Sequence, residues 1–153
     1  MRRRRHERGV SSQDRELGVE LYNDAWRLLE SREDDDKLLH QAHASAYHWL
    51  KAPECEPRNR ARSEWLCSRV YSVLGRAEPA MHHAQRCLVI CEANPENVED
   101  WDLAFAYEAL ARAHRVAGNE DEARRYEQLG REQAEVIADP EDRESLLRDL
   151  SSL

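Results

Sequence analysis

The chain has 153 residues, a length that suits one domain with its own hydrophobic core. Its net charge is −8, and 35% of its residues are charged but only five are Gly and five are Pro, which favours a helix-rich soluble protein. The acidic balance argues against nucleic-acid binding, and no apolar run reaches the roughly 18 residues needed to cross a bilayer. We therefore expect neither nucleic acid nor a membrane as a partner.

Residues 1–11 are predicted to form a flexible basic tail. The arginine run from Arg2 to Arg5 is followed by Arg8, and no apolar segment comes after it. A secretory signal needs such a segment, so secretion is not expected, and a basic terminus of this kind is typically solvated. The four cysteines lack C-x-x-C spacing, and three lie at apolar helical positions. This pattern predicts reduced thiols in a cytoplasmic protein.

The first predicted helix covers residues 12–30, where apolar residues recur every three or four positions. The acidic stretch 33–36 follows, and negative charge suits the positive N-terminal end of a second helix. We expect that stretch to lengthen the first hairpin. The second helix should end at the Ala52-Pro53 pair, since proline cannot continue a helix.

Two more hairpins and a closing helix are predicted after this point. Further helices are expected over residues 58–74, 79–91, 95–117, 119–138 and 140–151. The resulting hairpins would span about residues 12–51, 57–93 and 95–138, with a capping helix over residues 140–151. Gly75 and Gly118 are suited to end helices, and Asn119 with Glu122 resembles a capping box. Asp139 before a proline predicts the start of the last helix.

Three stretches of the chain superimpose at a spacing of 43 residues, as positions 32, 75 and 118 show. The aligned columns are Ala25, Ser68 and Ala111; Leu28, Tyr71 and His114; and Arg32, Gly75 and Gly118. Each stretch thus has a small residue, then a bulky one, then a turn residue, as a helix needs in order to pack closely on its neighbour and then reverse direction. One such hairpin cannot bury its apolar face alone, so an all-α stack of antiparallel hairpins is predicted.

The segment Tyr71-x-x-x-Gly75-x-x-x-x-Ala80, and a second that begins at His114, resemble the tetratricopeptide repeat (TPR). The resemblance is good over residues 58–138 and weak before them. The period departs from the usual length of about 34 residues, and the first hairpin lacks the turn glycine. The resemblance implies a short TPR-like solenoid with a C-terminal capping helix and a concave groove that binds a polypeptide.

The resemblance also implies which residues line the groove. Carried over position by position, they are Tyr22, Trp26, Arg62, Trp65, Arg69, Phe105, Glu108 and Arg112. Aromatic and arginine side chains supply rigid apolar area and donors for carboxylates and peptide carbonyls. The Lys, Asn and Arg set with which some TPR domains hold a C-terminal carboxylate is absent, so a chaperone-tail receptor is not expected. Asp102 and Glu108 are expected as rim or solvated charges.

Three functional hypotheses arise from these patterns. The preferred one is a non-catalytic module, without a cofactor or bound metal, that binds a protein or peptide in the groove. The second is a small helical metal- or ligand-binding protein that uses His40, His43, His48, His82 and His83. No H-E-x-x-H motif supports it, and the Cys87–Cys91 pair would need two further zinc ligands. The third is a homo-oligomer whose groove accepts a neighbouring helix or tail, and the chain's own tail is a further possible occupant.

Overall fold

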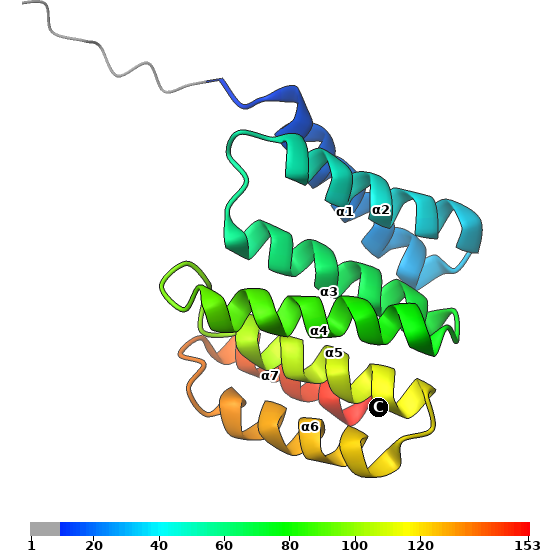
Figure 1. The fold of residues 1–153 in the computed structure, drawn as a ribbon, viewed down its shortest axis with the longest axis vertical. Coiled ribbons are helices and arrows are strands. Elements are labelled where there is room, and N and C mark those ends of the chain that lie inside the picture. The colour runs from blue at the N-terminus through cyan, green and yellow to red at the C-terminus, as the bar shows by residue number, and fades with distance from the viewer. Residues whose placement is uncertain (1–9) are drawn as a thin grey trace, which may run out of the picture.

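The computed structural model describes residues 10–153, which fold into seven helices and no strand. The helices are α1 (Gln13–Ser31), α2 (Asp35–Lys51), α3 (Pro57–Val73), α4 (Ala77–Ala93), α5 (Asp102–Val116), α6 (Glu120–Ala134) and α7 (Pro140–Ser151). Helix α1 packs on α2, α3 on α4 and α5 on α6, and the three hairpins stack in chain order with α7 against α5 and α6 (Figure 1). The prediction of an all-α stack of hairpins with a C-terminal closing helix is confirmed.

Left-handed backbone at the turn of each hairpin marks the 43-residue register. The φ angle is 54° at Arg32, 73° at Gly75 and 81° at Gly118. In the two glycine turns, the next residue donates its backbone N–H to the carbonyl five residues earlier, at 2.9 Å in both. The three residues of this predicted column therefore share one conformation, although only glycine adopts it without a Cβ penalty.

The start of α5 differs from its prediction. The helix begins at Asp102 rather than near Pro95, because residues 94–101 form turns that local hydrogen bonds hold. The Asp102 carboxylate accepts the backbone N–H of Glu99 at 2.8 Å, and the Asn94 side chain donates to a carbonyl of α4 at 2.8 Å. These side-chain bonds compete with helical ones, as they commonly do at turns.

Two further details of the hairpins differ from expectation. The acidic stretch does not lengthen the first hairpin, because residues 32–34 join α1 to α2 and the other two hairpins also have connections of three residues, 74–76 and 117–119. Within this stretch, Asp34 caps α2 by accepting the Lys37 N–H at 2.9 Å. The Asn119 side chain makes no capping bond, so the predicted capping box is wrong. Asp139 does cap α7, where it accepts two backbone N–H groups at 2.8 and 3.1 Å.

Small side chains allow the helices to approach closely. Two columns of small residues are buried: Ala25, Ser68 and Ala111, and, seven residues before each, Gly18, Ala61 and Ala104. At Gly18 a Cβ atom would lie only 2.9 Å from the Trp49 ring, and the carbonyl of Gly18 accepts a hydrogen bond from Ser45 at 2.7 Å. The contact between α1 and α2 therefore requires glycine at this point.

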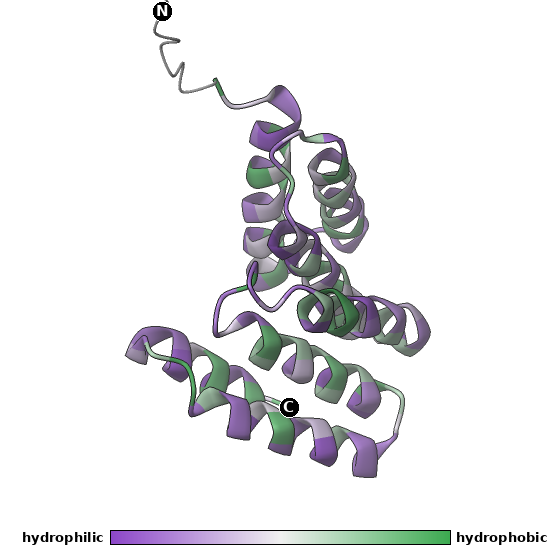
Figure 2. Ribbon diagram, turned by 60° about the vertical axis from the view of Figure 1, so that its left-hand side comes forward, coloured by the Kyte–Doolittle hydropathy of each residue, from purple (hydrophilic) through white to green (hydrophobic). Residues whose placement is uncertain are grey.

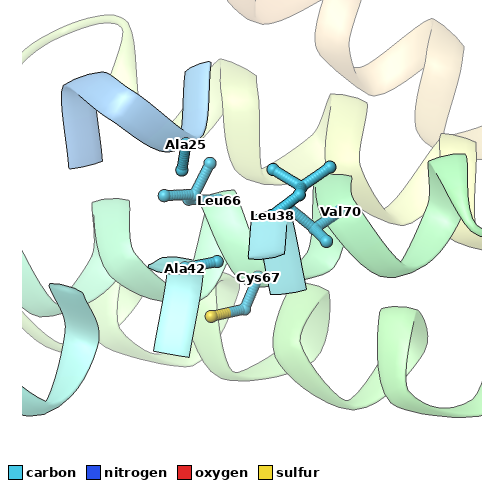
Figure 3. Packing of buried hydrophobic residues seen from close by; sticks show 6 residues of the cluster. All are labelled: Ala25, Leu38, Ala42, Leu66, Cys67 and Val70. Atoms are coloured by element: carbon cyan, nitrogen blue, oxygen red, sulfur yellow. The ribbon is translucent and has the colours of Figure 1, made fainter. Parts of the chain in front are cut away.

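Apolar side chains fill the space between the hairpins. Figure 3 shows one such cluster, in which Ala25 of α1 and Leu38 of α2 meet Leu66 and Val70 of α3. Each helix carries both apolar and polar residues along its length (Figure 2). The cysteines at positions 67, 87 and 91 are buried free thiols, as predicted. Among residues 10–153, no helix combines the length and apolar character that crossing a membrane requires.

The predicted tail, residues 1–11, lies outside the described residues apart from Val10 and Ser11. At the boundary, the next residue, Ser12, caps α1 by accepting the backbone N–H of Arg15 at 3.1 Å. The Ser12 hydroxyl also donates to the Glu54 carboxylate at 2.7 Å, which ties the start of α1 to the segment that joins α2 and α3.

Substitutions at the left-handed turn positions should change stability in opposite directions. Gly118→Val should destabilise the fold by about 1–2 kcal/mol, since a branched side chain is strained in this conformation. Arg32→Gly should stabilise it by up to about 1 kcal/mol, because it relieves the same strain and loses only an exposed ion pair with Asp35. Urea denaturation would measure both, and changes of the same sign would contradict the shared conformation.

Candidate functional site

Helices α1, α3 and α5 bring the large aromatic side chains into a row. The ring centroids of Tyr22 and Trp26 lie 6.4 Å apart, those of Trp26 and Trp65 5.1 Å, and those of Trp65 and Phe105 5.4 Å. Trp101 continues this aromatic row at 6.1 Å from Phe105. The row therefore crosses the first helices of all three hairpins, where the resemblance places the groove.

Two neighbouring cavities open along the aromatic row. The inner cavity, of about 110 Å³, has walls that include Ala61, Trp65, Cys87 and Phe105. The outer cavity, of about 270 Å³, has walls that include Val19, Trp49, Asn59 and Ser63. Three residues line both cavities and separate them: Tyr22, Arg62 and Trp101. The groove thus has an apolar compartment beside a more polar one.

The wall between the cavities is held in place by an ion pair. Arg62 donates two hydrogen bonds to the Asp102 carboxylate, both of 3.0 Å, and its guanidinium carbon lies 4.2 Å from the centroid of the Trp101 ring. Asp102 is buried, so the expectation of a rim or solvated carboxylate is wrong. Its counter-charge comes from another hairpin, which spacing along α5 does not show. Arg62 is consequently neutralised and offers the cavities a flat surface rather than a free charge.

Glu108 is also buried, with 1% of its side chain exposed, so its predicted position among rim or solvated charges is wrong. Its carboxylate accepts hydrogen bonds from Arg69 at 3.1 Å and Arg112 at 2.7 Å, and from the Trp65 indole at 3.4 Å. Arg112 also donates to the Asp149 carbonyl at 3.2 Å. This network ties α3 and α5 to α7 and holds the Trp65 ring of the aromatic row.

The structure distributes the eight predicted groove residues among three places. Tyr22, Arg62, Trp65 and Phe105 line the cavities, Trp26 packs on Trp65, and Arg69, Glu108 and Arg112 form the buried network. Sequence reasoning missed Trp101 and Ser63. Trp101 lies in the loop that was predicted as helix. Ser63 occupies the position that Ala106 holds in the next hairpin, and a polar residue at that position was the available signal.

A second cluster of titratable groups lies where α2, α3 and α4 meet. The Nε2 atom of His43 lies 2.8 Å from the Tyr71 hydroxyl, and the His83 ring stacks on Tyr71 with centroids 5.6 Å apart. The Nδ1 atom of His83 lies 2.6 Å from the Glu64 carboxylate. The thiol of Cys67 is buried beside His43, and burial raises its pKa to about 12. A thiol with so high a pKa is a poor nucleophile at neutral pH.

The hypothesis of metal binding requires ligands gathered at one point. Within residues 10–153, no group of three or more His, Cys, Asp or Glu side chains is placed to hold a metal ion. The structure brings His43 and His83 together, with ring centroids 5.6 Å apart, whereas His48 pairs separately with Asp14 at 2.8 Å. His43, His48 and His83 thus each take part in a side-chain hydrogen bond or ion pair.

Comparison of the chain with protein-family models, with curated proteins and with solved structures finds no match in any of the three. The TPR resemblance therefore stays a prediction based on Tyr71, Gly75 and the residues aligned with them. The aromatic row, the two cavities and the charges around them are the features from which a function can be inferred.

Replacing the buried carboxylate should test the network that closes the row. Glu108→Gln should destabilise the fold by about 2–4 kcal/mol, because the largely buried Arg112 loses its counter-charge and Arg69 loses the nearer of its two carboxylate partners. Arg125→Gln is the control, because it breaks an exposed pair with Glu122 and should cost less than about 0.5 kcal/mol. Denaturation followed by circular dichroism would measure both, and equal effects would show that the buried network adds no stability.

Acidification should weaken the fold through His43. Although His43 is exposed as a residue, partial desolvation of its ring, and after it the neighbouring His83, holds its pKa below the usual value of 6.5, whereas Glu64 opposes this shift. The unfolded chain therefore binds the proton at a higher pH than the folded chain does. Stability from this group is complete above the unfolded pKa and falls as the pH drops through the folded one.

The pH effect is measured as the change in unfolding free energy between about pH 7.5 and about pH 5. His43→Gln should make this change smaller than in the unmodified protein, because glutamine does not titrate. Identical pH profiles for His43→Gln and the unmodified protein would refute the role of His43.

Proposed function

We propose that this protein is a non-catalytic interaction module that binds a peptide segment of a partner protein in the groove along α1, α3 and α5. The observation that carries the proposal is the pair of cavities, of about 110 and 270 Å³, beside the aromatic row. Rigid aromatic walls provide a large apolar contact area at a small cost in side-chain entropy, as in many protein-binding surfaces.

The TPR resemblance supports a polypeptide as the ligand. It assigns binding to the first helix of each hairpin, and the cavities lie on these helices, with Tyr22 from α1, Trp65 from α3 and Phe105 from α5 in the walls. The left-handed column at positions 32, 75 and 118 supports a repeat of TPR-like hairpins with a longer period. A cytoplasmic location and the absence of a cofactor form part of the same proposal.

The groups around the inner cavity support binding without chemistry. A hydrogen bond with Cys91, and after it burial, raises the pKa of the Cys87 thiol well above its usual value. The thiolate is the nucleophilic form of cysteine, so this thiol is poorly suited to covalent catalysis. Among residues 10–153, Asp102 is the acidic residue that lines the cavities. Its carboxylate accepts two hydrogen bonds from the Arg62 guanidinium and is thereby neutralised.

Selection from a random peptide library displayed on phage tests the proposal. Enriched peptides should bind the protein in solution, and Val19→Glu should weaken their binding by at least about tenfold, or about 1.4 kcal/mol. Val19 lines the outer cavity and is 38% exposed, so a carboxylate there obstructs the groove without entering the core. The control is Val89→Glu, at a valine of α4 that is 62% exposed and lines neither cavity.

Titration calorimetry and tryptophan emission would report the binding, since the row contains the indoles of Trp26, Trp65 and Trp101. Failure to enrich any peptide, or the same loss of affinity in both valine variants, would contradict the proposed groove. A mass in solution that rises with protein concentration, and that Val19→Glu returns to the monomer, would favour self-association through the groove instead.

A further inference from the structure

Ser63 lines the outer cavity and carries a buried hydroxyl. Its residue is 6% exposed, and its Oγ atom has no hydrogen-bond partner among residues 10–153. Burying a hydroxyl without a partner is unfavourable, because its hydrogen bonds with water are lost and not replaced. The equivalent position of the next hairpin is the fully buried Ala106, so packing of the repeat does not need a hydroxyl here. The hydroxyl therefore lacks a partner beside the outer cavity, and a ligand amide seated there would supply one after a small shift of the Ser63 side chain.

The two cavities differ in the chemistry that they offer. Aromatic rings and small apolar groups, such as those of Trp65, Phe105 and Ala61, surround the inner cavity. Hydrogen-bonding groups of Ser63 and Asn59 lie in the outer cavity, on the other side of the wall that Arg62 forms. In an extended peptide, each side chain is followed by a polar main-chain amide. A peptide can thus place a side chain in the inner cavity and an amide in the outer one.

We infer, on the basis of the proposed function, that the groove recognises one uncharged apolar side chain in the inner cavity and an adjacent main-chain amide at Ser63. The volume of about 110 Å³ is somewhat below the roughly 150 Å³ of an apolar protein cavity that admits benzene, so an aliphatic side chain or a small ring fits it. A charged side chain is excluded, because the charges of Arg62 and Asp102 already neutralise each other.

The net charge of residues 10–153 indicates which residues flank the apolar anchor in the peptide ligand. Residues 1–9 contain five arginines and one glutamate and thus carry a net charge of +4. Because the whole chain carries −8, residues 10–153 carry a net charge of −12. An acidic body attracts basic segments and raises their rate of encounter. The ligand is therefore a short basic segment with a single apolar anchor residue.

Two serine variants on the same helix separate a ligand contact from a structural role. Ser63→Ala removes the hydroxyl at the outer cavity. Ser72→Ala is the matched control, because Ser72 is also on α3, is 7% exposed, has an unpartnered Oγ atom among residues 10–153 and lines a different cavity, of about 190 Å³, beside α7. Both variants should unfold at a higher urea concentration than the unmodified protein. Only Ser63→Ala should bind the selected peptides more weakly, by about five- to tenfold.

Changes in the selected peptides test the ligand's side of the contact. The enriched sequences should share one apolar residue flanked by Lys or Arg. Replacing the apolar residue by Asn should weaken binding by at least about tenfold, because an amide would lose its hydrogen bonds in the inner cavity. Replacing the basic residues by Gln should weaken binding more at low salt than at high salt, since salt screens long-range attraction.

The outcomes distinguish this inference from the proposed function. Peptides that depend on Val19 but bind Ser63→Ala as tightly as the unmodified protein would overturn the inference and leave the groove in place. Enriched peptides without a shared apolar anchor would do the same, as would a Ser63→Ala variant less stable than the unmodified protein. Failure to enrich any peptide would overturn both.

Discussion

Close contact between helices, at positions where only a small side chain fits, determines the rest of this structure. A Cβ atom at Gly18 would collide with Trp49, and the buried Ser68 hydroxyl donates to the carbonyl of Ala80 at 2.8 Å. These contacts set the distance between neighbouring helices. At this distance, bulky residues that neighbour the small ones contact each other from adjacent helices. Trp26 of α1 and Trp65 of α3, for example, have ring centroids 5.1 Å apart. The aromatic row is thus a consequence of where the small residues lie.

Arginine has a structural role in this groove. Two carboxylates of α5, those of Asp102 and Glu108, are buried, and arginines of α3 compensate both of them. Leaving either carboxylate without a partner would be costly in so dry an environment, so the pairs bind α3 to α5. The pairing also removes free charge from the groove. Under the proposed function, selectivity would consequently depend on the shape of the cavities, on the Ser63 hydroxyl and on the negative net charge of residues 10–153.

The 43-residue register preserves geometry more closely than residue identity. Tyr71 stacks on His83 with ring centroids 5.6 Å apart and an interplanar angle of 5°. The equivalent positions of the next hairpin hold the same pair reversed, with His114 on Tyr126 at 5.5 Å and 10°. The left-handed turn likewise persists at Arg32, where glycine is absent. A flat ring and a reversal of the chain are the constraints at these positions, and more than one residue type meets them.

The sequence by itself determined the all-α class, the glycine turns at 75 and 118, and the final helix begun by Asp139, because these features depend on residues a few positions apart. Only the tertiary structure decided that Asp102 and Glu108 are buried and that Ser63 borders a cavity. The α3 arginines that pair with these carboxylates are 40 and 39 residues away, and only the second partner of Glu108, Arg112, is a neighbour on α5. Which helix faces meet depends on how one hairpin packs on the next, and local periodicity carries no information on that angle.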